Sequence, residues 1–153
     1  MTRTTIVRSS LPITFHVLAT TATNHVLMVR GKRASGEEGW VLPHGQVPGG
    51  RCVILTARER LLETTGCDRA LAEVYAVSPL TDDHGHLNGL TYVLDGGHLP
   101  DLPSREPKTG ASWVPMRELH EPPALYQYAI IAAGQRRKLP LLVNADRPEA
   151  AFL

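Results

Sequence analysis

Residues 40–67 of this chain read WVLPHGQVPGGRCVILTARERLLETTGC, and this stretch decides the fold. Glycine and proline are concentrated between residues 44 and 50, where they favour backbone angles that other residues avoid, so this part predicts a loop. Over residues 52–65, side chains suited to a buried face recur at spacings of three and four, which predicts a helix. These side chains are Ile54, Ala57, Leu61 and Thr65. Gly66 follows, where a left-handed cap is expected to end the helix.

Strand patterns lie on both sides of this stretch. Five segments rich in Val, Leu, Thr and other strand-forming residues predict strands at 13–20, 25–30, 70–78, 88–95 and 112–115. A final helix is predicted over 123–137, with Tyr128 on its buried face and Pro140 beyond its end. Strands, a glycine loop, a helix, more strands and a terminal helix together predict an α+β fold with a sheet packed between helices.

Composition limits the classes of protein to consider. The chain has 153 residues, of which 42% are hydrophobic and 20% charged, so we expect one domain over 1–153 with an ordinary core. The net charge of +1 gives no reason to expect a nucleic acid or an anionic membrane as partner. Cys52 and Cys67 make no disulfide framework, and the sequence has no long apolar run, so we expect a reduced, cytoplasmic setting without a membrane span.

The segment from Gly45 to Cys67 resembles the box of the Nudix hydrolase family, whose consensus is Gx5Ex7REUxEExGU with U an aliphatic residue. The frame fits without a gap, with Gly45, Glu63 and Gly66 in their consensus places. Trp40-x-Leu42-Pro43 before the box and Trp113-Val114-Pro115 after it also match the family. The resemblance covers about residues 13–137 and implies the Nudix fold, in which a mixed β-sheet is sandwiched between α-helices.

The box departs from the family at its carboxylates. Arg51 stands where the family has Glu, Glu59-Arg60 stand where it has Arg-Glu, and Thr64 replaces the second Glu of the pair. In the family these carboxylates hold Mg2+ or Mn2+ against a diphosphate, since such ions prefer oxygen ligands. Positions 60, 63 and 64 share about 100° of helix arc, and there Glu63 is the remaining carboxylate.

Two hypotheses follow for the altered box. Glu59 precedes Glu63 by four residues, so the two could chelate one ion together, with both as metal ligands and catalytic groups. Alternatively, Glu59 pairs with a neighbouring arginine on the surface. Arg51 and Arg60, with Gly45 beside them, could instead bind a phosphate directly, because arginine binds phosphate in a bidentate manner without a metal.

Three features outside these positions also carry candidate chemistry. His44 is a candidate acid or base near neutral pH, or it simply fills a position where the family has glycine. The run Asp82-Asp83-His84-Gly85-His86 has metal-ligating residue types, although Asp and Gly also favour solvated turns. Glu37 and Glu38 could supply a carboxylate from outside the box.

Three functions remain open from the sequence. The resemblance implies a pyrophosphohydrolase that cleaves a diphosphate linked to another moiety, with Mg2+ or Mn2+ as cofactor and a phosphate-containing small molecule as partner. A second possibility is an inactive Nudix-fold protein that binds such a ligand as a regulator, and a third is a fold recruited for non-hydrolytic chemistry in a biosynthetic pathway. Many family members are homodimers, so the resemblance leaves a homodimer open.

Overall fold

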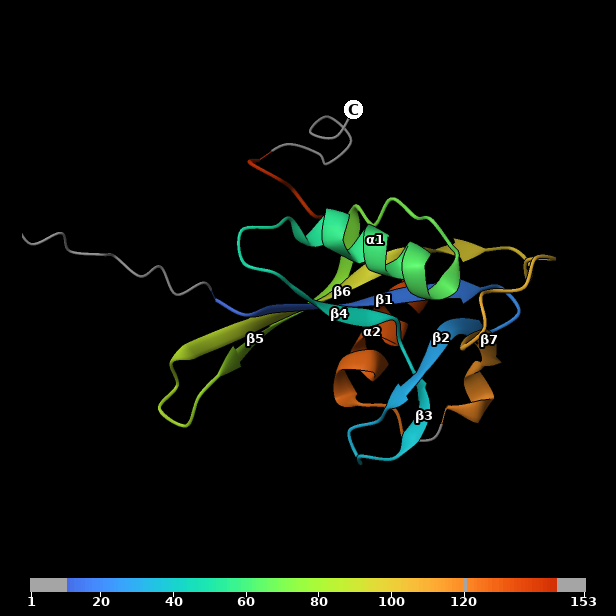
Figure 1. Ribbon diagram of the computed structural model, residues 1–153, viewed down its shortest axis with the longest axis horizontal. Coiled ribbons are helices and arrows are strands. Elements are labelled where there is room, and N and C mark those ends of the chain that lie inside the picture. The colour runs from blue at the N-terminus through green and yellow to red at the C-terminus, as the bar shows by residue number, and fades with distance from the viewer. Residues whose placement is uncertain (1–10, 120, 146–153) are drawn as a thin grey trace, which may run out of the picture.

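A mixed β-sheet forms the centre of the computed structural model, which describes residues 11–119 and 121–145 (Figure 1). The sheet runs in the order β3-β2-β1-β6-β5-β8, while β4 pairs with β1 and β7 pairs with β2. Strands β1 and β6 are parallel, and the other pairs are antiparallel. The strands are β1 (Ile13–Thr21), β2 (His25–Lys32), β3 (Glu38–Val41), β4 (His44–Val47), β5 (Glu73–Thr81), β6 (Leu87–Leu99), β7 (Ala111–Pro115) and β8 (Leu139–Pro140).

Two α-helices, α1 (Val53–Thr65) and α2 (Ala124–Gly134), cover opposite faces of the sheet (Figure 1). Strand β1 shows why both faces are buried, because its side chains alternate between them. Phe15 packs in the apolar cluster that includes α1, and Leu18 packs in the cluster that includes α2. A short 3-10 turn, η1 (Met116–Glu118), follows β7. The predicted α+β architecture is confirmed.

Helix α1 follows its sequence pattern closely. Its buried residues are Ile54, Ala57, Leu61 and Thr65, which are the four predicted from the spacing. Gly66 has φ of 78° and its backbone N–H donates to Leu62 O, as expected of a left-handed cap. The helix therefore presents its other face, with Glu63 and Arg60, to solvent and to the site described below.

The last helix differs from its prediction in length and at one residue of its predicted buried face, whereas Ala129 is buried as predicted. It spans Ala124–Gly134 rather than 123–137. The side chain of Tyr128 is 71% exposed, so its predicted core position is wrong, and Tyr126 is buried at 9% instead. The physical reason is that α2 is apolar on nearly all sides, so its composition does not select the face that packs on the sheet.

Strand β4 lies within the segment predicted as a loop. It pairs with β1 in antiparallel register, so that His44 is opposite His16 and Gly45 is opposite Phe15. This pairing draws the glycine-rich segment onto the sheet edge beside α1. The result fixes His44 on a strand rather than on a free loop.

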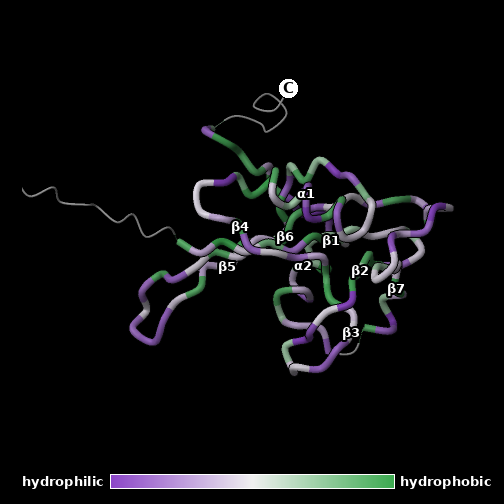
Figure 2. Tube along the Cα trace, viewed as in Figure 1, coloured by the Kyte–Doolittle hydropathy of each residue, from purple (hydrophilic) through white to green (hydrophobic). Residues whose placement is uncertain are grey.

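Strands β5 and β6 form a hairpin that projects from the body of the structure (Figure 1), and hydrophilic residues gather at its tip (Figure 2). At the tip, Asp82 Oδ1 accepts the backbone N–H groups of His84 and His86, each at 2.9 Å. These contacts are those of an Asx-type turn. Within the described residues, no group of three or more His, Cys, Asp or Glu side chains is placed to hold a metal ion. None of the described helices is both long and apolar enough to cross a membrane.

Candidate functional site

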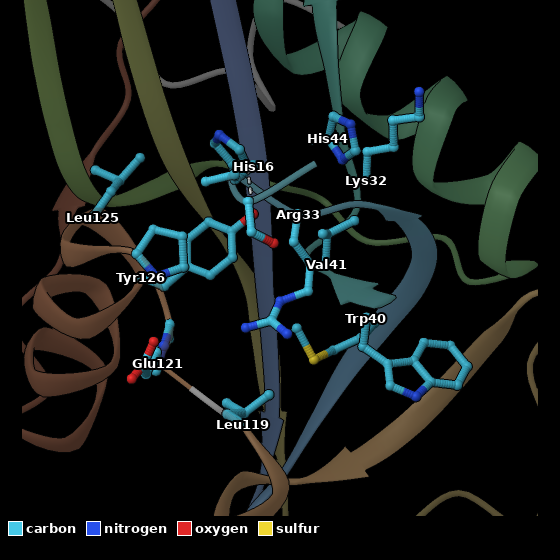
Figure 3. A pocket seen from close by; sticks show the side chains of 15 residues that line it. His16, Lys32, Arg33, Trp40, Val41, His44, Leu119, Glu121, Leu125 and Tyr126 are labelled. Atoms are coloured by element: carbon cyan, nitrogen blue, oxygen red, sulfur yellow. Dashed lines mark hydrogen bonds between the residues drawn. The ribbon is translucent and has the colours of Figure 1, made fainter. Parts of the chain in front are cut away.

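Two pockets meet at His44, which lines both of them. The first has a volume of about 500 Å³ and is called the aromatic pocket, with walls that include His16, Trp40, Leu125 and Tyr126 (Figure 3). The second has a volume of about 320 Å³ and is called the basic pocket. Its charged lining residues are Arg30, Arg60, Glu63 and Lys108.

The charged residues of the basic pocket come from three parts of the chain, and β4 adds His44. Strand β2 supplies Arg30, the last turns of α1 supply Arg60 and Glu63, and the loop before β7 supplies Lys108. Three cations and one carboxylate give this lining a net charge of +2 with His44 neutral. The pocket therefore favours an anionic ligand.

The cations of the basic pocket are held in place by neighbours. Arg60 Nη1 lies 3.7 Å from Glu63 Oε2, an i,i+3 pair whose side chains are 51% and 71% exposed. Lys108 Nζ donates to Glu63 O at 3.3 Å, and Lys108 N donates to Thr65 O at 3.1 Å, so the loop is laid along the end of α1. The Arg30 guanidinium lies 4.4 Å from the centre of the Trp40 ring, a cation–π contact.

His44 carries its proton at a defined ring nitrogen. Its Nδ1 lies 2.9 Å from Leu42 O, and a carbonyl oxygen can only accept a hydrogen bond. Nδ1 is therefore the protonated nitrogen, which leaves Nε2 of the neutral imidazole as an acceptor. Such a nitrogen has the electronic form of a general base.

His16 and Tyr126 support His44 from the aromatic pocket (Figure 3). The rings of His16 and His44 stack with centroids 5.8 Å apart, and the Tyr126 ring meets His16 edge-on at 5.3 Å. Tyr126 Oη and His16 Nδ1 lie 3.3 Å apart, within hydrogen-bond distance. Burial, and then the charge of His44, lower the pKa of His16 to about 4, while burial raises the pKa of Tyr126. Both groups are therefore neutral at pH 7.

Two glycines leave room for this arrangement. A Cβ at Gly31 would lie 2.9 Å from Val41 Cγ2 and 3.9 Å from His44 Cε1. A Cβ at Gly45 would lie 2.9 Å from Phe15 Cζ and 3.7 Å from Arg60 Cγ. Contacts of 2.9 Å are too short for carbon atoms. The absence of a side chain at Gly45, predicted as a substrate-binding position, is thus explained by packing.

The charged and titratable site residues predicted from the sequence separate into two groups. His44, Arg60 and Glu63 line the basic pocket, while Glu59 and Arg51 line neither pocket. Arg51 Nη1 lies 3.4 Å from Glu59 Oε2, with side chains 62% and 70% exposed, which matches the surface-pair alternative for Glu59.

Three further residues, His16, Arg30 and Lys108, were missed by the sequence reasoning. They lie outside the box, and no motif near them signals a site. Of the outside carboxylates considered, Glu37 and Glu38 line neither pocket.

The lining of the basic pocket does not fit a resident divalent cation. Mg2+ requires several oxygen ligands in near-octahedral geometry. In this part of the described chain Glu63 is the acidic side chain, and it is paired with Arg60. Thr64 Oγ1 donates to Arg60 O at 2.8 Å, so this hydroxyl is turned to the helix backbone. A dication would also lie beside three fixed cations, which repel it.

Comparison with known proteins identifies the architecture. No family model matches the sequence, and no curated protein matches it. Among solved structures, the chain is similar to a Nudix hydrolase from Nitrosomonas europaea, with a TM-score of 0.61 and 19% identity over 86% of this chain and 94% of that one. The chain has the Nudix fold.

Two other structures agree with this assignment. A MutT protein from Methanosarcina mazei matches with a TM-score of 0.57 and 17% identity, covering 86% of this chain and 99% of that one. The Nudix domain of NrtR from Shewanella oneidensis, in a cocrystal with ADP ribose, matches with a TM-score of 0.56 and 15% identity, over 84% and 88% of the two chains. At these identities the likeness concerns the fold, and the chemistry depends on the residues of the two pockets.

Proposed function

We propose that this protein hydrolyses a small molecule in which a diphosphate is linked to another moiety. The observation that carries the proposal is that one histidine lines both a pocket with net positive charge and a larger aromatic pocket. A diphosphate in the basic pocket would leave the linked moiety to occupy the aromatic pocket. The volume of about 500 Å³ lies in the range of pockets for small organic ligands, roughly 300–1,000 Å³.

The aromatic pocket suits a moiety with apolar or planar surface. Trp40, Leu125 and Tyr126 provide apolar wall, and His16 is neutral because its pKa is lowered to about 4. Lys32, Arg33 and Glu121 are the charged residues that also line this pocket. Pockets of this kind combine apolar walls with a few polar groups that orient the ligand. The NrtR domain of the same fold was solved with ADP ribose, a molecule that contains both a diphosphate and such a moiety.

In the proposed reaction, His44 acts as the general base. Its Nε2 accepts a proton from a water molecule whose oxygen attacks a phosphorus atom of the diphosphate. A new P–O bond forms to the water oxygen, and the bond between that phosphorus and the leaving phosphate oxygen breaks. Arg60 and Lys108 oppose the negative charge that develops on the phosphate oxygens. The proton on His44 then passes to solvent or to the leaving group.

The test is cleavage of a panel of compounds in which a diphosphate links a nucleoside to another moiety, followed by chromatography of the two phosphate monoester products and measured with Mg2+, with Mn2+ and with chelator. We expect wild type to turn over at least one compound and His44→Gln to lose about 10²–10⁴-fold in kcat, the usual contribution of a general base. The control is His86→Gln, because that side chain is 80% exposed at the hairpin tip. Equal rates for His44→Gln and His86→Gln would refute the role of His44.

A second candidate function is binding without turnover, as in a sensor or regulator. It is favoured by one specific observation, namely that Glu63 is the acidic side chain of the basic pocket and is already paired with Arg60. Calorimetric binding of a panel compound, with no phosphate monoester products formed over hours by wild type, would replace the hydrolase proposal with this one.

A further inference from the structure

We propose that the basic pocket binds phosphate through Arg30, Arg60 and Lys108 with no divalent metal, and that Glu63 positions Arg60 rather than holding an ion. This inference rests on the proposed function only in placing a diphosphate in the basic pocket. The positive charge that a phosphate site needs comes in this inference from three side chains rather than from a divalent metal ion. It also gives roles to Arg30 and Lys108, which lie outside the box.

The charge balance of the pocket supports this assignment. Three cations and one carboxylate line it, so positive charge is present before any ion arrives. Arginine is charged at every physiological pH and binds phosphate oxygens in a bidentate manner. A divalent cation would have to enter against this charge with one carboxylate as protein ligand.

The cations are also preorganised, which reduces the entropy lost when a ligand binds. Arg30 is held over Trp40 at 4.4 Å, and Lys108 is held at the end of α1 by its backbone and ammonium contacts. The three cations come from separate parts of the chain and line the same pocket of about 320 Å³. The three side chains can therefore contact the same anion.

Glu63 has a distinct role in this arrangement. Its carboxylate lies 3.7 Å from Arg60 Nη1, and its carbonyl accepts from Lys108 Nζ at 3.3 Å. The carboxylate contact restrains Arg60, whereas the carbonyl contact does not depend on the side chain. Because the amide oxygen of Gln can still accept a hydrogen bond from Arg60, Glu63→Gln should leave phosphate binding nearly intact, which is opposite to the behaviour of a metal ligand.

The experiment is titration calorimetry with inorganic pyrophosphate on the full chain, in EDTA and again with Mg2+. Wild type should bind in EDTA, and Arg60→Gln and Lys108→Gln should each weaken binding about tenfold, as expected for loss of one charge-assisted contact. Glu63→Gln should change the Kd by less than roughly threefold, because the Gln amide oxygen still accepts a hydrogen bond from Arg60 and the exposed charge itself contributes little. The matched control is Arg58→Gln, an arginine on the same helix that pairs with Asp68 and lines neither pocket.

Each outcome decides the inference. Binding that requires Mg2+ and is lost in Glu63→Gln would overturn it in favour of a metal site. No pyrophosphate binding in any buffer, or equal affinities for Arg60→Gln, Lys108→Gln and Arg58→Gln, would also overturn it. Circular dichroism of each variant checks that the fold is kept.

The outcome is separable from that of the proposed hydrolysis. Metal-free pyrophosphate binding without turnover of any panel compound supports this inference and removes the hydrolase. Turnover that depends on Mg2+ and on Glu63, with no binding in EDTA, keeps the hydrolase and removes this inference.

Discussion

Replacing Gly45 by Ala tests how strand β4 is attached to the core. The added Cβ would lie 2.9 Å from Phe15 Cζ and 3.2 Å from Phe15 Cε1, whereas carbon atoms in contact prefer about 3.5–4.0 Å. Phe15 is 1% exposed and packs in the cluster beneath α1, so its ring has no open space to enter. The substitution must therefore displace the ring or move β4 away from β1.

The expected cost follows from the packing. Overfilling a well-packed core costs about 1–3 kcal/mol, and the lower backbone entropy of the unfolded Ala chain offsets about 0.4–1 kcal/mol of it. We expect Gly45→Ala to lower the free energy of unfolding by about 1–2 kcal/mol. For a chain of this size, the melting temperature should fall by about 2–8 °C.

Urea denaturation followed by circular dichroism measures this change. The control is Gly134→Ala, because a Cβ there meets no atom within 4 Å, so stability should stay equal or rise slightly. The double variant Gly45→Ala/Phe15→Leu should show a favourable coupling of about 1 kcal/mol, since the smaller side chain leaves room for the methyl group. Equal stabilities of Gly45→Ala and Gly134→Ala, or strictly additive effects in the double variant, would refute the steric explanation.

Three further predictions concern titration and ion pairs. Burial lowers the pKa of His16 to about 4, so between about pH 6.5 and pH 4 the unfolded chain binds a proton at this residue and the folded chain does not. As the pH falls through this window, wild type should lose up to about 2–3 kcal/mol more of its free energy of unfolding than His16→Gln. Equal pH dependence of stability in the two proteins, measured by denaturation, would contradict this. Lys138 Nζ donates at 2.9 Å to Asp95, whose side chain is 9% exposed, so Lys138→Ala should lower the free energy of unfolding by about 1–2 kcal/mol in urea denaturation. Lys138→Arg keeps the charge and should retain most of this stability, and equal losses in the two variants would show that charge is not the cause. Arg58 and Asp68 form an exposed ion pair at 3.1 Å, with side chains 39% and 55% exposed. Arg58→Ala should therefore lower the free energy of unfolding by less than about 1 kcal/mol, and a larger loss in the same assay would argue against a simple surface pair.

Helix α1 was predictable because its information is local. The spacing of Ile54, Ala57, Leu61 and Thr65 defines one face of an α-helix, and Gly66 supplies the left-handed residue that ends it. The sheet packs against this face without changing which residues of the helix are buried. The same local logic located β1 and β2, whose observed bounds extend their predicted ranges by one or two residues.

Helix α2 shows where local information runs out. Tyr126 and Tyr128 lie two residues apart on a helix that is apolar nearly all round, so the sequence offers no polar face to place toward solvent. The packing of the helix on the sheet buries Tyr126 beside His16 and leaves Tyr128 exposed. Strand β4 was missed for a related reason, since its pairing with β1 depends on a partner far along the chain.

The sequence by itself determined helix α1 with its Gly66 cap and the α+β class, because each depends on residue types at short, regular spacings. The tertiary structure decided which charges share a pocket. Arg30 and Lys108 reach Arg60 only because β2 and the loop before β7 fold against the end of α1, and His16 reaches His44 only through the pairing of β1 with β4. Contacts between residues distant along the chain carry no periodic signal, so three-dimensional packing decides them.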